Sequence, residues 1–315
     1  MNEEIKIHDI IEYIISEESK GLRADQGIAK ENKQFSRSLI QKWIKKGIIK
    51  INDKIAKPKD ILEENDKVTI MPEENINPEY IEPQDIKINI AYEDKDLIII
   101  NKKTNIICHP AAGHSKGTIA NGLIYLYPEL KNLPRSGLIH RLDKDTTGLL
   151  IVARTIESYT TLIKKMQERK ISRNYIAFSH GLIMKNGIIN QPISRHRLDR
   201  KKMSVNINGK EAITEYKVIK NYKKNSKVKL KLHTGRTHQI RVHMQNIGFP
   251  LIGDKVYGVN IKANDMFDEK IKFFPRQALH AESLSLIHPK TNKNINISSQ
   301  LPDDLISLEK HLDNE

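Results

Sequence analysis

The sequence predicts an α+β fold with a small N-terminal domain and a larger C-terminal domain, and three observations favour it. The chain has 315 residues, which is enough for one small and one medium domain. Segments with helical spacing and segments with strand spacing follow one another without the regular alternation of a doubly wound sheet. An acidic stretch with three prolines between residues 72 and 83 shows no periodic pattern. We therefore place domains at residues 1–72 and 87–315, joined by a linker at residues 73–86.

The N-terminal domain is predicted to hold two helices followed by two strands. Residues 11–15 fit either a short strand or an early helical turn, and residues 21–31 have helical spacing. Ser36 suits the N-cap of a second helix because its hydroxyl can accept from the free N–H groups of the first turn. Gly47 is expected to end that helix. Its apolar stripe consists of Leu39, Ile40, Trp43 and Ile44. The strand candidates that follow are residues 48–51 and 67–70.

Basic side chains lie largely off this apolar stripe, which is the ordinary pattern of a solvated helix face. The order of elements favours a second interpretation, because residues 20–71 resemble the S4-type RNA-binding module. That resemblance depends on Arg23-Ala24-Asp25, on residues 36–40, on Gly47 and on the strand before Asn52-Asp53. It implies that an RNA backbone is contacted by Arg23, Arg37, Lys42, Lys45 and Lys46.

The larger domain is predicted to combine strands with a few helices. Val228, Leu230 and Leu232 alternate with polar residues, which is typical of a half-buried strand. Helical spacing precedes Pro128, a residue that closes a helix. The other predicted strands are residues 96–101 and 149–153, and the predicted helices are residues 118–127, 155–170 and 237–246.

The charge balance favours a polyanionic partner. Lys plus Arg is 53 and Asp plus Glu is 39, a net charge of +14, and basic residues set against phosphates release condensed counterions. A compositional bias of the source toward Lys, Ile and Asn would explain the same numbers. With one cysteine, Cys108, the chain forms no intramolecular disulfide and no cysteine-rich zinc site. The N-terminus does not resemble a signal peptide, and no apolar run approaches the ~20 residues of a membrane span. We expect a cytoplasmic protein, and a monomer by default.

The candidate catalytic segment is a polar loop between two apolar strands, within residues 136–154. It contains His140-Arg141-Leu142-Asp143, then Lys144 and Asp145, and it ends at Gly148. Loops on a rigid sheet are common positions for catalytic groups. An ordinary turn rich in Asp, Lys and Thr would have the same composition.

This segment closely resembles the signature of the pseudouridine synthases that act on ribosomal large-subunit RNA. The resemblance covers nearly all of residues 90–305 and implies a catalytic domain with a mixed, largely antiparallel sheet flanked by helices and loops. Within the family, residues 253–258 are more similar to the D-type branch than to the C-type. The other matching segments are His109 to Gly113, Arg173-Asn174-Tyr175, His233 to Met244, and Gln277 to Ala281.

The resemblance assigns roles to individual residues. The Asp of His-Arg-Leu-Asp is the catalytic residue of the family, which here is Asp143. Arg241 would pair with Asp143 and hold its carboxylate in line. Tyr175 would stack on the uracil and take part in moving the C5 proton, a task suited to a positioned phenol.

Four more residues are expected to bind the substrate. Arg141 would enter the RNA helix and help to push the uridine out, because the reacting carbon is unreachable while the base is stacked. Leu279 would pack under the flipped base, although its residue type fits a plain core position equally well. Arg236 and Lys144 are expected to contact phosphates.

No cofactor or metal is expected for this reaction. Pseudouridine formation breaks the bond between ribose C1′ and uracil N1, rotates the base and joins C1′ to C5, and only the C5 hydrogen exchanges with solvent. An ionised carboxylate serves either as nucleophile or as base and electrostatic partner to the sugar. The expected partner is large-subunit ribosomal RNA or a pre-ribosomal particle.

One stretch departs from the family, which usually has Asn-Lys-Pro-Ala-Gly where this chain has residues 101–105. Asn105 can supply a left-handed backbone, so we expect an altered turn and an unchanged fold.

Two other function classes compete with the synthase hypothesis. A metal or glycosidase site would use Asp143 and Asp145 as paired carboxylates, but no second acidic cluster accompanies them. His238 and His243 are also five apart, which is off the zinc-binding helix spacing. A pure RNA-binding or ribosome-assembly factor would predict a lost catalytic residue, whereas Asp143, Tyr175 and Arg241 are all present.

Overall fold

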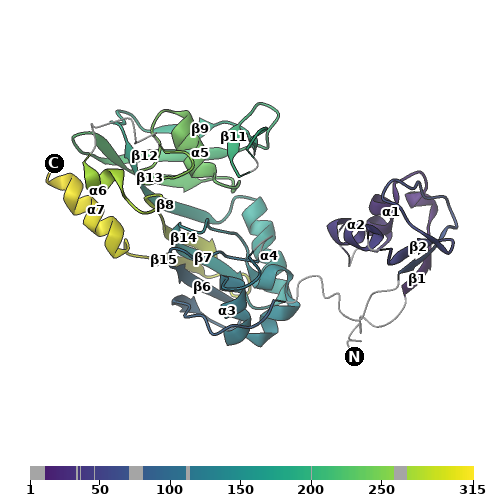
Figure 1. Cartoon of the computed structure of the whole chain (residues 1–315). Helices are drawn as coiled ribbons and strands as arrows, with labels where there is room; N and C mark the ends of the chain where they lie inside the picture. Colours follow the sequence, from purple (N-terminus) through teal and green to yellow (C-terminus); the bar gives the residue numbers. More distant parts are fainter. Residues whose placement is uncertain are drawn as a thin grey trace. The chain divides into compact units, whose positions relative to one another are not determined.

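The computed structural model describes residues 11–32, 35, 37–45, 47–70, 81–110, 114–199, 201–258 and 268–315. The chain divides into two compact units, Met1–Tyr80 and Ile81–Glu315. Both units are drawn in Figure 1, and each is described by itself. Together they have the predicted α+β composition, because each unit contains both helices and a sheet.

The first unit combines helices with a four-stranded antiparallel sheet of order β1-β4-β2-β3. Its buried core includes Ile40, Trp43 and Ile44, which confirms this part of the predicted apolar stripe. Residues 11–15, which fitted either a strand or a turn, begin with a strand. The elements are β1 (Ile11–Ile14), η1 (Glu17–Ser19), α1 (Ala24–Glu31), α2 (Arg37–Lys45), β2 (Ile49–Ile51), β3 (Lys54–Ile55) and β4 (Lys67–Ile70).

Gly47 ends α2 as predicted, with a left-handed φ of 72°. Its N–H donates to the carbonyl of Ile44, and the next N–H, of Ile48, donates to the carbonyl of Trp43. Ser36, the predicted N-cap, lies outside the described residues, as do the predicted RNA contact Lys46 and the side chains of Leu39 and Lys42.

The second unit is built on a nine-stranded mixed sheet. Among its described strand pairs, only β7 and β14 run parallel, so the sheet is largely antiparallel as predicted. The order is β5-β6-β7-β14-β8-β13-β12-β9, with β15 on β14. The strands are β5 (Ile90–Glu93), β6 (Leu97–Lys102), β7 (Thr147–Ala153), β8 (Ser172–His180), β9 (Gly187–Asn190), β12 (Ile213–Asn221), β13 (Asn225–Leu232), β14 (Leu279–Ile287) and β15 (Asn294–Ser298); β10 (Ile193–Arg195) and β11 (Met203–Val205) pair separately.

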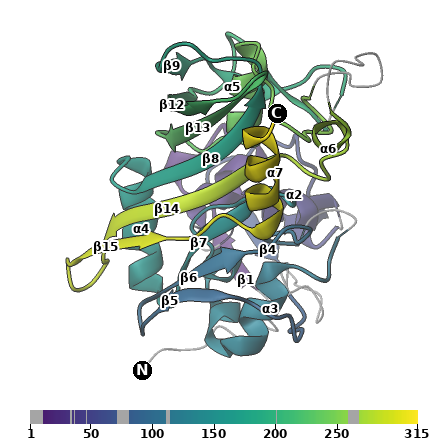
Figure 2. The same ribbon diagram turned by 90° about the vertical axis from the view of Figure 1, so that its left-hand side faces the viewer.

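Helices pack on this sheet from several directions, and α7 crosses β8 and β14 (Figure 2). Leu305, Leu308 and Leu312 of α7 share a buried cluster with Ile176 and Phe178 of β8. The helical elements are α3 (Ile119–Leu126), η2 (Pro128–Asn132), η3 (Pro134–Gly137), α4 (Ile156–Gln167), α5 (Gln239–Asn246), α6 (Glu269–Lys272) and α7 (Asp303–Asp313).

The central strands β6 and β7 are apolar on both faces because both faces are covered. Ile98 and Val152 pack into the cluster that contains α3 residues, while Ile99 and Ile151 pack into the cluster that contains Leu162 of α4. A strand buried on both sides is a continuous apolar run and does not alternate with polar residues. This is why residues 96–101 and 149–153 carried a clear strand signal.

Two backbone positions shape the connections around the central strands. Gly148 has φ +109°, and a Cβ there would lie 2.3 Å from the carbonyl oxygen of Ala281, so only glycine lets β7 approach β14 this closely. Asn105 has φ 62°, which confirms that it supplies the left-handed conformation of the altered turn at residues 101–105.

Residues 81–86 of the predicted linker are part of the second unit. Ile81 is buried in its core. The carbonyl of Glu82 accepts from the Asn121 amide at 2.8 Å, and the N–H of Gln84 donates to the Asn121 carbonyl at 3.1 Å. Residues 73–80 lie outside the described residues, so the limits of the linker remain a prediction.

Candidate active site

Asp143 lies in a loop between η3 and β7 whose backbone is held before and after it. The Sγ atom of Cys108 bonds both the carbonyl and the N–H of Leu142, at 3.2 and 3.3 Å. Burial raises the pKa of the Cys108 thiol, so it stays protonated and can donate. The carbonyl of Asp143 accepts from the N–H of Thr146 at 3.1 Å. These bonds fix the backbone on both sides of the carboxylate.

Two buried cations hold the next two carbonyls of the loop. Lys102 is 2% exposed, and its Nζ donates to the carbonyls of Lys103 and Lys144, each at 2.8 Å. Burial lowers the pKa of Lys102 to about 8. Arg276 is 4% exposed and donates to the carbonyl of Asp145 at 3.1 Å, while Asp304 of α7 binds its other nitrogens at 2.7 and 2.9 Å. The loop is therefore a rigid support for Asp143.

The predicted pair of Arg241 and Asp143 is present, with Nη1 of the arginine 3.0 Å from Oδ2 of the aspartate. Most of the guanidinium is bound elsewhere: Nε and Nη2 donate to the buried carboxylate of Asp254 at 2.7 and 2.9 Å. Burial alone would lower the pKa of Arg241, but the two carboxylates outweigh it and raise that pKa. Arg241 is thus a permanent cation that faces Asp143 with one nitrogen.

The turn before α5 positions this arginine. His238, the residue before the helix, has a left-handed φ of 56°, a conformation in which His is enriched among non-glycine residues. The side chain of Gln239 braces the turn, because its Oε1 accepts from the N–H of Arg236 and the hydroxyl of Thr234. Its Nε2 donates to the carbonyl of Ile213 on β12. The helix therefore starts at a defined angle on the sheet.

His238 is a second neighbour of Asp143. Its Nε2 lies 3.9 Å from Oδ1 of the aspartate, and its Nδ1 lies 2.8 Å from the hydroxyl of Tyr257. That hydroxyl accepts from the N–H of Met203 at 2.7 Å, so its own proton is available for Nδ1. Burial lowers the pKa of His238, although Asp143 opposes the shift. A neutral imidazole thus presents its Nε2–H toward the Asp143 carboxylate.

Tyr175 of β8 and Leu279 of β14 line the same pocket as Asp143 and Arg241. The strands bring them together, because Leu279 pairs with Ala177, two residues from Tyr175. Burial raises the pKa of Tyr175, so the phenol remains protonated at neutral pH. An aromatic face and an aliphatic side chain beside a carboxylate suit a flat, uncharged base.

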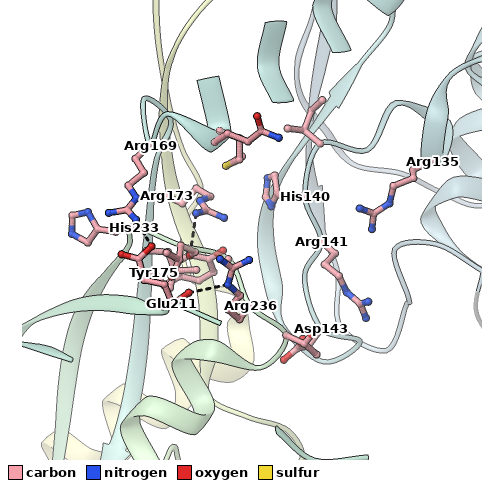
Figure 3. Close-up of a pocket in the computed structure, with 17 residues that line it drawn as sticks. Arg135, His140, Arg141, Asp143, Arg169, Arg173, Tyr175, Glu211, His233 and Arg236 are labelled. Carbon is pink, nitrogen blue, oxygen red and sulfur yellow. Dashed lines mark hydrogen bonds and ion pairs between the residues drawn. The ribbon is translucent and has the colours of Figure 1, made fainter. Parts of the chain in front are cut away.

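A basic cleft of about 450 Å³ adjoins this pocket and shares Asp143 and Tyr175 with it. Five arginines line the cleft against two carboxylates, Asp143 and Glu211. Figure 3 shows the arginines on both of its sides, with His140 between them. They are Arg135, Arg141, Arg169, Arg173 and Arg236.

The structure brings six of the seven predicted catalytic and substrate-binding residues to one pocket. Lys144 is the exception, because it lines a neighbouring hollow with Asp145 and Lys255. The six that meet are Asp143, Tyr175, Arg241, Arg141, Leu279 and Arg236.

The predicted RNA contacts of the first unit fall into two groups. Arg23 and Arg37 are half-exposed, and both bind the fully buried carboxylate of Asp25. Burial raises the pKa of Asp25, but the Gln41 hydrogen bond and the two arginines outweigh it, so the pKa lies below its ordinary value. Lys45 is exposed, and no ion pair to a described residue is found for it.

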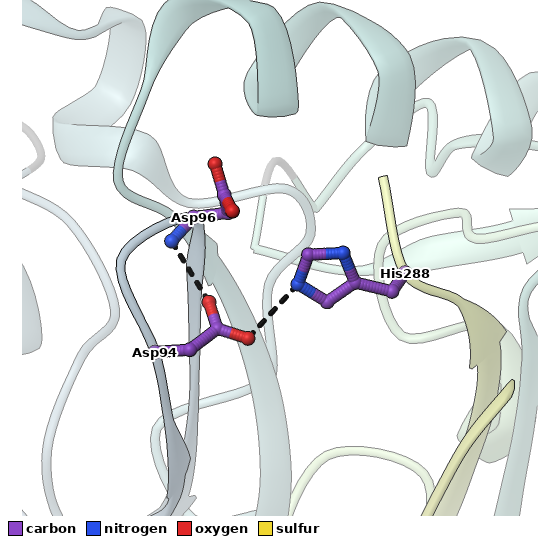
Figure 4. Close-up of side chains that lie close together, drawn as sticks. All are labelled: Asp94, Asp96 and His288. Atoms are coloured by element: carbon purple, nitrogen blue, oxygen red, sulfur yellow. Dashed lines mark hydrogen bonds and ion pairs between the residues drawn. The ribbon is translucent and has the colours of Figure 1, made fainter. Parts of the chain in front are cut away.

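Asp94, Asp96 and His288 form a cluster that resembles a metal site (Figure 4). The hydrogen bonds of His288 and Asp94 account for this cluster without a metal. Nδ1 of His288 accepts from the N–H groups of Lys290 and Thr291, so its Nε2 carries the proton and donates to Asp94 at 2.9 Å. The other oxygen of Asp94 accepts from the N–H groups of Asp96 and Leu97. His288 thus has no lone pair left for a metal.

The residues that support Arg241 and the loop of Asp143 were not predicted from the sequence. Asp254 lies within the matched segment 253–258, and its partner Arg241 was predicted as a site residue, but their contact was not foreseen. Lys102 was noted only as part of an unusual turn. Arg276, His238 and Cys108 carry no local pattern that distinguishes a support from a surface residue.

A family model described as RNA pseudouridylate synthase matches residues 96–246, and an S4 domain model matches residues 22–68. The Ribosomal large subunit pseudouridine synthase D of Haemophilus influenzae is 42% identical over 93% of this chain and 92% of its own length. The protein of the same name from Escherichia coli is 41% identical over 93% and 91%. Both resemblances drawn from the motifs are confirmed.

Solved structures agree at the level of the fold. Human RNA Pseudouridylate Synthase Domain Containing 4 matches with a TM-score of 0.56 and 24% identity, over 71% of this chain and 93% of that one. Human RNA Pseudouridylate Synthase Domain Containing 1 matches with a TM-score of 0.53 and 24% identity, over 73% and 96%. Among the described residues, no helix has the length and apolar character to cross a membrane. On its sequence relatives and its matched domains, the chain belongs to the RNA pseudouridylate synthase family.

Proposed function

We propose that this protein isomerises specific uridines of large-subunit ribosomal RNA to pseudouridine, with Asp143 as the catalytic carboxylate. The observation that carries the proposal is the pair of Asp143 and Arg241 at 3.0 Å in a pocket shared with Tyr175 and Leu279. The substrate class is supported by the S4 domain and by relatives named for large-subunit ribosomal RNA.

The geometry suggests how each group acts. Arg241 holds Oδ2 of Asp143, and Oδ1, which lies 3.9 Å from Nε2 of His238, would face the ribose of a bound uridine. The protonated phenol of Tyr175 would stack on the uracil and exchange the C5 proton, and Leu279 would support the base from below. The bond that breaks joins C1′ to N1 and the bond that forms joins C1′ to C5, so atoms balance apart from the exchanged hydrogen.

The basic cleft gives the RNA a route to this pocket. Its arginines would bind the backbone without reading sequence. Arg141, exposed and adjacent to the catalytic loop, is placed to occupy the space of the extruded uridine. Arg236 would hold a phosphate at the rim, and Lys144 would do so in the neighbouring hollow. Arg23, Arg37, Lys42, Lys45 and Lys46 of the first unit would add backbone contacts.

A cytoplasmic location, a monomeric state and independence of cofactors belong to the same proposal. The single cysteine fits a reducing compartment, and an isomerisation with balanced atoms requires no redox partner or metal.

The decisive experiment is tritium release from ribosomal RNA labelled at uridine C5. Wild type should release tritium, and Asp143→Asn, which keeps the shape but not the charge, should release none. Asp145→Asn is the matched control, and it should retain activity because Asp145 holds the loop through its carbonyl. Loss of release in both variants would mean that the Asp145 carboxylate also serves the reaction and that Asp143 does not act alone.

An RNA-binding assembly factor is the second candidate, and the five-arginine cleft favours it. The two functions separate in one comparison: Asp143→Ala should keep its RNA affinity while losing isomerisation. Absence of release by wild type on unmodified, folded large-subunit RNA, with tight binding retained, would favour the assembly factor.

A further inference from the structure

We propose that Arg173 and His140 form a subsite for one backbone phosphate of the RNA, at the floor of the basic cleft beside the base pocket. The inference rests on the proposed function, because that function makes RNA the expected ligand. Nothing in the catalytic roles above uses either side chain.

Arg173 of β8 is a buried cation that no described carboxylate neutralises. It is 6% exposed, and its Nη2 donates to the carbonyl of Thr234 at 3.1 Å. Its Nε has no hydrogen-bond partner among the described residues. Burial lowers the pKa of this guanidinium. A desolvated charge with one carbonyl partner costs free energy in the folded protein, and an anion in the cleft would offset that cost.

His140 also lines this cleft, and it holds an unpartnered donor that is itself buried. It is 9% exposed, and its Nε2 accepts from the N–H of Ile151 at 3.2 Å. The proton of the neutral ring is therefore on Nδ1, which has no partner among the described side chains and backbone groups. Burial first, and the charges of Arg173 and Arg135 second, lower the pKa of His140 to about 3. His140 therefore stays neutral and keeps its Nδ1–H as a donor. It lies close enough to Arg173 for the charge of the guanidinium to lower its pKa (Figure 3).

The backbone opposite leaves room for Arg173. A Cβ on Gly235 would lie 2.8 Å from Nη1 of Arg173, so a larger residue there would press on the guanidinium. Gly235 and Thr234 line the same cleft. The loop that positions α5 therefore also shapes the space around Arg173.

The position of Arg173 on β8 indicates which phosphate it would take. Arg173 and Tyr175 are two residues apart on one strand, so they share a side and lie about 7 Å apart along it. Both line the cleft that contains Asp143. A phosphate held by Arg173 would thus belong to a nucleotide next to the one in the base pocket.

The other arginines of the cleft differ from Arg173 in being exposed. Arg169 and Arg236 are both bound to Glu211, through its carboxylate at 2.6 Å and its carbonyl at 2.9 Å. Arg135 and Arg141 are exposed to solvent. A buried, pre-positioned donor contributes more per contact than a hydrated one, because it loses less water and less side-chain freedom on binding.

The first test uses inorganic phosphate at constant ionic strength and follows thermal unfolding by calorimetry. The fluorescence of Trp43, the single tryptophan, identifies the transition of the first unit, so the other transition belongs to the second. Phosphate should raise the wild-type Tm of the second unit. Arg173→Met should lose that shift, while its own Tm without phosphate should equal or exceed that of wild type. A lowered Tm with an unchanged phosphate shift would mean that Arg173 is structural and would overturn the subsite.

Smaller changes separate the two donors. His140→Gln keeps an acceptor for the Ile151 N–H but removes the Nδ1 donor, so it should reduce the phosphate shift without abolishing it. Arg173→Lys keeps the charge and should restore part of the shift. A full shift in both Arg173→Met and His140→Gln would overturn the assignment.

The second test uses ribosomal RNA and separates an RNA phosphate from a free anion. Arg173→Met should weaken binding about tenfold and lower the slope of log Kd against log salt by about 1. Lys310→Met, which removes an exposed charge on α7 outside the cleft, should leave the slope unchanged. A lost phosphate shift with an unchanged RNA slope would mean a free-anion site and overturn the RNA assignment.

Failure of the subsite and failure of the proposed function give different results. If wild type releases tritium and Arg173→Met binds RNA with the wild-type slope, the subsite is wrong and the function stands. If wild type releases no tritium but the slope falls in Arg173→Met, the function is wrong and the subsite stands.

Discussion

Asp254 lies buried behind Arg241 and accepts two hydrogen bonds from its guanidinium, at 2.7 and 2.9 Å. The N–H groups of Val256 and Tyr257 bind the same carboxylate at 2.9 and 3.0 Å. Burial raises the pKa of Asp254, but Arg241 and these N–H groups outweigh it and hold the pKa below its ordinary value. Asp254 thus sets the angle at which Arg241 meets Asp143, the proposed catalytic residue.

Asp254→Asn should therefore impair catalysis, although Asp254 acts only through Arg241. An asparagine presents an NH₂ group to one guanidinium nitrogen and leaves Arg241 a buried charge with a weaker partner, which costs about 3–5 kcal/mol of stability. A misplaced Arg241 should lower kcat of tritium release by about 100-fold, with a smaller change in KM. Glu309→Gln, which breaks the half-buried pair with Lys227 on β13, is the control. It should destabilise the protein and leave kcat unchanged. Equal kcat in Asp254→Asn and wild type would contradict the positioning role.

Lys102→Met should lower kcat because it releases the catalytic loop. The change removes two hydrogen bonds to the carbonyls of Lys103 and Lys144 but nearly preserves the side-chain volume. Each lost hydrogen bond from the charged amine costs about 1.5–3 kcal/mol. We expect a loss of kcat of about tenfold or more, with little change in RNA affinity. Lys103→Met, which alters the exposed neighbour, should behave like wild type. If both variants were fully active, the loop would not depend on Lys102.

The stability of the second unit should fall as the pH falls below about 6.5, in part because of His140. The ordinary pKa of this imidazole is 6.5, and in the folded protein it is about 3. Between these values the unfolded chain binds a proton that the folded protein excludes, so stability is present above pH 6.5 and is lost toward pH 3. One such group contributes about 1.4 kcal/mol per pH unit.

The measurement is hydrogen exchange of β7 amides at pH 7, 6 and 5, converted to free energies of opening. His140→Gln should flatten the dependence by this amount, while His114→Gln, which changes an exposed histidine, should not. If the free energies of opening of wild type and His140→Gln changed with pH in the same way, His140 would titrate in the folded protein near its ordinary pKa.

The first unit offers a sharper test of RNA binding than its arginines do. Arg23 and Arg37 also neutralise the buried Asp25, so their removal would destabilise the unit as well as remove charge. Lys45 is exposed in the last turn of α2, and Lys45→Met should lower the salt slope of RNA binding by about 1. Lys59→Met, on the loop between β3 and β4, is the control with the same charge change. Equal effects of the two variants would indicate a response to net charge alone.

Most elements of the fold followed from local patterns. The predicted helix at residues 118–127 is α3, Ile119–Leu126, and the predicted strand at residues 67–70 is β4, Lys67–Ile70. In these segments the apolar period and the end signals agree, because each element packs the face that its sequence makes apolar. The order of β14 between β7 and β8 had no such signal, since pairing between distant strands leaves no mark on local periodicity.

The sequence by itself determined the family and the α+β class, and it predicted Asp143, Tyr175 and Arg241 as site residues, because these inferences depend on residue types in a fixed order along the chain. Only the tertiary structure decided that Asp254 orients Arg241, that Lys102 and Arg276 hold the catalytic loop, and that Arg173 and His140 face the basic cleft. The physical reason is that these roles depend on burial and on contacts across more than 10 residues of chain, such as Arg276 with the carbonyl of Asp145 at a separation of 131. A buried lysine or arginine and a solvated one are the same residue type in the sequence, and only the packing around them distinguishes them.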